Sequence, residues 1–232
     1  MKLELILSII IAAATTVTAQ EVKTKKVSDA QTQSVINDDR GRAFIISGTT
    51  EPLLIAPQGK IIAEPQQESV FLGKEWATAA MRERESELAN LLPNLRDQTE
   101  LNALTQRGLK NFFAATFSQE KFVDAKSNHT ISDLEIQSLL EAMLRDHSLQ
   151  PANAGKLYVI FLDSAMRSTL GTMIAGKHYL AYYNFFNFTG VKIQYVVVPF
   201  EANQKTAYQI ALRAFLAAVL NPGDDNSGKP LR

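Results

Sequence analysis

Histidine and cysteine, two residue types that often carry acid–base or nucleophilic chemistry, are scarce or absent in this chain. Such chemistry needs a nucleophile or an activated water held against a histidine or a carboxylate. The sequence has three histidines, His129, His147 and His178, and no cysteine. Without cysteine there are no disulfides, thiolate metal sites or cysteine nucleophiles. No two histidines are spaced to share one helical face, which excludes a His-Glu-x-x-His zinc site in its usual form.

The three histidines differ in how far their surroundings favour a function. His147 is expected in the last turn of a helix, where it complements the helix dipole. His129 lies in Asn128-His129-Thr130, which is a glycosylation sequon in a host that glycosylates exported proteins and otherwise a loop. His178 is best placed for function, because it is close in sequence to three tyrosines near two predicted strand ends. A structural role is the alternative for His178.

Asp163 and Ser164 directly follow an apolar run, Leu157 to Leu162, that predicts a buried strand. The carboxyl end of a strand is where α/β proteins often place site residues. A turn that caps the strand end is the alternative. A Gly-x-Ser-x-Gly elbow and a Gly-rich phosphate loop are both missing. The segment Tyr179 to Phe188, rich in tyrosine and phenylalanine, favours core packing, with a sugar or peptide groove as the alternative.

The elements that must position these residues alternate between strands and helices. Strands are predicted at 43–47, 53–55, 60–63, 69–72, 157–162 and 191–200, and an extended run at 112–117. Helices are predicted from Lys74 to Pro93, from 99 to 106, from 132 to 147 with a capping box at Ser132 and Glu135, and from 204 to 220. Residues 164–189 are predicted to be an aromatic-rich connection. The fold class is therefore α/β or α+β, with a mixed sheet covered by helices.

The composition fits one exported globular domain. Hydrophobic residues make up 46% of the 232 residues, and 24 basic residues balance 24 acidic ones, so no net field favours nucleic acid. Residues 1–19, with Lys2, an apolar run and the small residues Val17 and Ala19, predict a signal peptide cleaved after Ala19. Its apolar run is too short for a stable membrane span. We expect a flexible lead-in at 20–42, one domain at 43–222 and a polar tail at 223–232.

A string of short segments carries a family resemblance. These segments are Ser69 to Trp76, Ile131 to Gln137, Lys156 to Leu162, Tyr179 to Asn184, Gln194 to Pro199 and Ala218 to Pro222. Their order resembles exported bacterial proteins related to the plant exordium, or phosphate-induced, family, over roughly residues 69–222. The resemblance implies a zincin-like scaffold with a buried C-terminal helix.

Many such relatives carry a His-Glu-x-x-Glu stretch on the final helix, and its residues are replaced here. By the resemblance, the histidine falls on Arg213, the glutamates on Ala214 and Ala217, and a further histidine on Tyr183. Arginine does not ligate zinc under ordinary conditions, because it stays protonated in proteins. These four residues and His178 would form a remnant pocket, with no catalytic residue, metal or cofactor expected.

Three function classes follow from these features. The first is an exported, non-catalytic binding or structural protein on a degenerate metallopeptidase-like scaffold, whose partner is a cell-envelope glycan, peptide or protein. The alternative is an extracytoplasmic hydrolase with an unrecognised site around Asp163 and His178. The third is an assembly protein that oligomerises through the aromatic segment.

Overall fold

The computed structural model describes residues 33–38, 41–47, 60–110, 121–123 and 129–222. The expected signal peptide and polar tail, and the runs predicted at 53–55 and 112–117, lie outside these residues. In chain order the elements are β1 (Gln33–Asp38), β2 (Gly41–Ile46), β3 (Gln66–Leu72), η1 (Glu75–Ala77), η2 (Ala79–Met81), α1 (Arg82–Leu88), α2 (Gln98–Gln106), β4 (Lys121–Val123), β5 (Thr130–Ser132), α3 (Asp133–Arg145), β6 (Lys156–Leu162), β7 (Arg167–Leu170), β8 (Met173–Ile174), β9 (Ala181–Phe188), β10 (Val191–Val198) and α4 (Gln204–Leu220).

The main sheet of the described residues is mixed and has the order β1-β2-β9-β10-β6-β3-β4. β10 pairs with β6, β6 with β3 and β3 with β4 in parallel. β1 pairs with β2, β2 with β9 and β9 with β10 in the antiparallel sense. A smaller sheet has the order β5-β7-β8. The expected class, a mixed sheet covered by helices, is confirmed.

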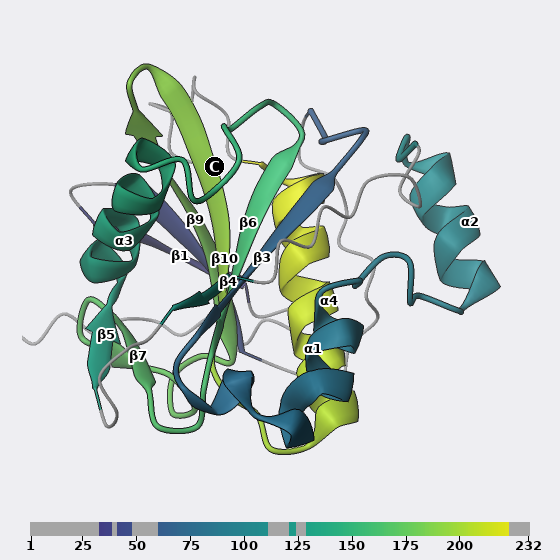
Figure 1. Cartoon of the computed structure of the whole chain (residues 1–232). Helices are drawn as coiled ribbons and strands as arrows, with labels where there is room; N and C mark the ends of the chain where they lie inside the picture. Colours follow the sequence, from purple (N-terminus) through teal and green to yellow (C-terminus); the bar gives the residue numbers. More distant parts are fainter. Residues whose placement is uncertain (1–32, 39–40, 48–59, 111–120, 124–128, 223–232) are drawn as a thin grey trace, which may run out of the picture. The chain divides into compact units, whose positions relative to one another are not determined.

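Helices cover both faces of the main sheet (Figure 1). Because side chains alternate along a strand, each central strand contributes to two separate cores. On one face Phe71, Val159 and Val196 pack against α4 and the α1 region. On the other face Val70, Ile160 and other alternate residues pack against α3. Central strands buried on both sides read as continuous apolar runs, and this explains why β6 and β10 were predictable from sequence.

Local sequence signals set the two long helices. Ser132 caps α3 and forms the predicted capping box with Glu135, and Asn203 caps α4 by accepting a hydrogen bond from the amide of Thr206. From Ile210 to Leu220, every residue of α4 except Arg213 is buried. Burying a Leu, Ile or Phe side chain stabilises a fold by about 1.5–3 kcal/mol, so α4 is held by tertiary packing more than by its own propensity.

Residues 164–189 are not a connection as predicted, because they contain β7, β8 and all of β9. β9 lies between β2 and β10, and its first four residues are all buried. A strand packed on both faces loses the alternation of apolar and polar residues that identifies a half-buried strand. The aromatic segment is therefore largely core: Tyr179, Tyr182, Tyr183 and Phe186 are buried.

Three further predictions were wrong in detail. The helix expected from Lys74 is broken into η1, η2 and α1, because Thr78 is extended and its hydroxyl bonds the carbonyl of Glu75 at 2.7 Å. Residues 60–63 form no strand; the amide of Ile62 instead donates to the carbonyl of Val219 on α4 at 2.9 Å. β1 lies within the segment expected as a flexible lead-in, since an edge strand needs few apolar residues.

Within the described ranges, no helix combines the length and the apolar character needed to cross a membrane.

Candidate functional site

Three of the four positions where the resemblance places metal-site residues are packed into the core. Ala214 and Ala217 are fully buried on α4, in the same apolar cluster as Tyr183 of β9 and Val196 of β10. Arg213, the third position on the helix, is partly buried. The structure thus brings Ala214, Ala217 and Tyr183 together, but in an apolar cluster between α4 and the sheet.

The polar side chains of Tyr183 and His178, the other predicted members of the remnant pocket, both have hydrogen-bond partners. The Tyr183 hydroxyl donates to the carbonyl of Asn221 at 2.6 Å, and burial raises the pKa of Tyr183 well above its ordinary value. The His178 side chain is exposed, and its Nδ1 accepts the amide of Ile174 at 2.9 Å. In return, the His178 amide donates to the Ile174 carbonyl at 3.0 Å. His178 therefore closes the turn after β8, and no described contact joins it to Asp163.

No group of three or more histidines and carboxylates in the described part of the chain is arranged to hold a metal ion.

Asp163 and Ser164 lie where the chain diverges at the carboxyl ends of the parallel neighbours β3 and β6. After β3 the chain continues into η1 and α1, whereas after β6 it continues into β7, which pairs with β5 in the smaller sheet (Figure 1). Such a divergence is the usual ligand position in open α/β sheets. The buried Asp163 carboxylate accepts the amides of Ala165 at 3.0 Å and Glu75 at 3.4 Å. Its two acceptor oxygens are thus engaged in shaping the turn.

Next to it, Ser164 forms a polar pair with Glu75. The exposed Ser164 hydroxyl lies 2.7 Å from both oxygens of the Glu75 carboxylate. A carboxylate beside a hydroxyl is a possible base and nucleophile pair, but it is also a common way to join two loops. The sequence pointed to Asp163 and Ser164; Glu75 was missed, because it is distant in sequence and belongs to a predicted helix.

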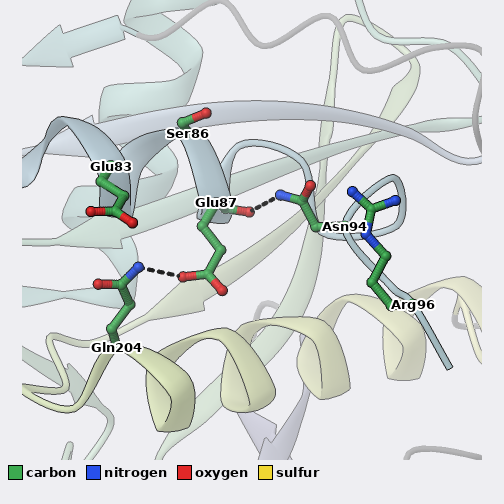
Figure 2. Close-up of a pocket in the computed structure, with 6 residues that line it drawn as sticks. All are labelled: Glu83, Ser86, Glu87, Asn94, Arg96 and Gln204. Carbon is green, nitrogen blue, oxygen red and sulfur yellow. Dashed lines mark hydrogen bonds between the residues drawn. The ribbon is translucent and has the colours of Figure 1, made fainter.

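A polar crevice lies between α1 and the first turn of α4, with a volume of about 480 Å³ (Figure 2). Its lining consists of charged and amide or hydroxyl side chains: Glu83, Ser86, Glu87, Asn94, Arg96 and Gln204. In Figure 2, Glu83 and Gln204 lie at one end and Arg96 at the other. The crevice therefore offers carboxylates, amides and a guanidinium group to a ligand.

Hydrogen bonds fix the walls of this crevice. Gln204 donates to the Glu87 carboxylate at 2.8 Å, and Asn94 donates to the Glu87 carbonyl at 3.1 Å. The hydroxyl of Tyr208 donates to the carbonyl of Leu91 at 2.8 Å. Burial, followed by the charge of Glu87, raises the pKa of Tyr208, so this hydroxyl keeps its proton. The lining is thus presented by α1, by the turn that follows it and by the start of α4, and hydrogen bonds join these three segments.

The buried Arg84 also joins α1 to the segment that precedes α4. Its guanidinium donates to the carbonyls of Glu201 and Ala202 and lies over the ring of Phe200 at 4.6 Å. Desolvation lowers the pKa of Arg84, an effect opposed by Glu201 and Glu87. Arginine remains charged in proteins all the same. Because these carbonyls immediately precede the α4 cap, Arg84 sets where the helix begins.

Sequence reasoning missed the crevice altogether. Its residues come from three separate segments, and only the acidic side of α1 was visible as a pattern, typical of a solvated helix face.

Comparison with known proteins finds no matching family model, no matching curated protein and no matching solved structure.

Proposed function

We propose that this chain is an exported binding protein without catalytic activity, built on a degenerate metallopeptidase-like, zincin-like scaffold. The observation that supports it most is the complete burial of Ala214 and Ala217 against the sheet. A metal-activated water needs ligands, a base and an open coordination position, and a methyl group packed in an apolar core supplies none of these. The proposal of export rests on the N-terminal sequence.

The crevice between α1 and α4 is the proposed ligand site. Its carboxylate, amide and guanidinium groups form hydrogen bonds with hydroxyl and amide groups, which are abundant on glycans and peptides. The lining carries no aromatic face or aliphatic anchor. A short polar segment of a cell-envelope glycan or peptide therefore fits this lining better than an apolar ligand does.

Amide chemical-shift mapping tests this proposal. Isotope-labelled mature protein is titrated with soluble cell-wall glycan fragments and with short peptides. We expect shifts confined to residues 83–96 and 203–208, and a loss of these shifts in Glu87→Gln or Arg96→Gln. Glu141→Gln, on the opposite face of the sheet, is the matched control and should bind as the wild type does. Shifts centred elsewhere, or equal in all variants, would contradict the crevice as the site.

One observation favours the second candidate, an extracytoplasmic hydrolase. Ser164 lies against Glu75 and next to Asp163, at a position where α/β sheets bind ligands. In this version Glu75, in place of His178, would be the base. Hydrolysis of ester or glycoside probes that disappears in Ser164→Ala, and whose pH profile changes in Glu75→Gln, would support it. Activity retained in both variants would count against it.

A further inference from the structure

Asp133, the first residue of α3, is a buried carboxyl group in a cluster of hydrogen-bond donors. The side chain is only 3% exposed. One oxygen accepts the hydroxyl of Tyr195 at 2.7 Å. The other accepts the side-chain amides of Gln137 at 2.9 Å and Asn184 at 3.1 Å. Residues from α3, β9 and β10 therefore meet at this one carboxyl group.

No cation is among the hydrogen-bond partners that the described residues give to Asp133. The basic side chains of His129, Arg145 and Arg167 do not pair with Asp133. His129 pairs with Glu135 at 3.4 Å, Arg145 lies over the ring of Phe188, and the side chain of Arg167 on β7 is exposed. An isolated buried carboxylate costs several kcal/mol in lost hydration, and such a group normally becomes neutral instead.

A second observation concerns Tyr182 on β9. Its side chain is fully buried, and its hydroxyl oxygen has no hydrogen-bond partner among the described residues. Asp133 is close enough for its charge to be a main cause, after burial, of the raised pKa of Tyr182. The neighbouring Tyr179 is already engaged, since its hydroxyl donates to Ser168 at 2.9 Å. The oxygen of Tyr182 is thus an unused acceptor beside a buried acid.

We propose that Asp133 is a buried carboxylic acid that donates its proton to Tyr182, and that this proton controls how firmly the start of α3 is latched to β9 and β10. The proton accounts for both observations at once: it removes the unpaired negative charge, and it gives the Tyr182 oxygen a donor. Among the described residues, the groups that face Asp133 are Gln137 from α3, Tyr182 and Asn184 from β9, Tyr195 from β10 and, in the segment before β9, the buried Tyr179.

The opposing effects can be ranked. A helix N-terminus favours a carboxylate by about 0.3–1 kcal/mol, and the three donors also favour the charged form. Desolvation of a group this deeply buried amounts to several kcal/mol and is the largest of the causes that act on this pKa. Accordingly, burial is the largest cause acting on the pKa of Asp133 and raises it, although the hydrogen bonds that Tyr195, Gln137 and Asn184 donate to the carboxyl group lower it.

The sign of the pH effect follows from linkage. An acid whose pKa is higher in the folded than in the unfolded protein binds more protons when folded, between those two values. In that window, which begins near the ordinary value of 3.8, each rise in pH removes stability. Above the folded pKa the loss is complete. The start of α3 is therefore held most strongly to β9 and β10 at acid pH, and this attachment weakens as the pH rises.

Carbon NMR of protein labelled at the aspartate carboxyl carbons tests the proposal. The Asp133 resonance is the one absent from Asp133→Asn, whose side chain offers one acceptor and one donor, as the protonated acid does. We expect this resonance to titrate at higher pH than the exposed aspartates do. A resonance that titrates with or below the exposed aspartates would overturn the proposal.

Tyr182→Phe supplies an independent test that does not depend on whether Asp133→Asn folds. If Tyr182 accepts the proton, its loss destabilises the acid form, and the Asp133 resonance shifts its titration to lower pH. If Tyr182 instead donates to a carboxylate, the same change shifts the titration to higher pH, which would overturn the proposal. Ser168→Ala, which removes only the partner of Tyr179, is the control and should leave the midpoint nearly unchanged.

Discussion

The turn between β3 and η1 offers a sharp test of how the carboxyl ends of β3 and β6 are built. Gly73 has a φ of +120°, a conformation that residues other than glycine rarely adopt. A Cβ atom at this position would lie 2.0 Å from Oδ2 and 2.1 Å from Cγ of Asp163. In Gly73→Ala the Asp163 side chain must therefore move, and its hydrogen bond to the Ala165 amide, now 3.0 Å long, is lost.

The magnitude follows from the two effects. Backbone strain at such a φ costs about 1–3 kcal/mol, and a buried polar group left unpaired costs about 1–3 kcal/mol. We expect Gly73→Ala to lower the free energy of unfolding by about 2–6 kcal/mol, measured by urea denaturation with an unchanged m-value. The matched control is Gly171→Ala, with a φ of +56° and no atom within 4 Å of the new Cβ. Gly171→Ala should lower the free energy of unfolding only by the backbone strain, about 1 kcal/mol.

A double-mutant cycle separates strain from contact. If the Asp163 side chain is the obstacle, Gly73→Ala should cost less in an Asp163→Ala background than in the wild type, because the colliding carboxylate is absent. Equal losses at Gly73 and Gly171, or additive losses in the cycle, would refute the reasoning.

Two further stability predictions concern buried groups. Lys156 and Glu68 form a buried ion pair at 3.1 Å. Lys156→Met alone should therefore lower the free energy of unfolding by about 3–5 kcal/mol, and adding Glu68→Leu should recover much of this loss. A double variant as unstable as the single one would argue against an uncompensated buried charge. Ala217→Glu should lower the unfolding free energy by more than about 3 kcal/mol, because it buries a charge in the core under α4. Gln209→Glu, exposed on the same helix, should change it by less than about 0.5 kcal/mol, and similar effects of the two changes would contradict the packing of α4.

How much of the fold was predictable depended on whether each signal was local. The start of α3 was predictable, because Ser132 and Glu135 form their capping box within one turn. The buried strand β6 and helix α4 were also predictable, since continuous burial leaves a continuous apolar run. β9 was not predictable, because Gly176 and His178 lie just before it and tyrosines and asparagines interrupt its apolar residues, although its first four residues are all buried.

The candidate sites depended on contacts that no spacing encodes. Gln204 meets Glu87 across 117 positions of sequence, and Tyr195 meets Asp133 across 62. The sequence showed Asp133 only as a first-turn acid, the residue type that complements a helix dipole. Its burial against β9 and β10 is a tertiary effect, as is the closing of the α4 face by Ala214 and Ala217.

The central claim is that the face of α4 turned to the sheet is filled by apolar packing and holds no catalytic metal centre. The most direct test is the zinc, iron and manganese content of the mature protein, purified without chelators or a histidine tag and measured by plasma mass spectrometry. The proposal predicts metal far below one ion per chain, unchanged in His178→Ala. Near-stoichiometric metal that survives dialysis and is lost in His178→Ala would contradict it.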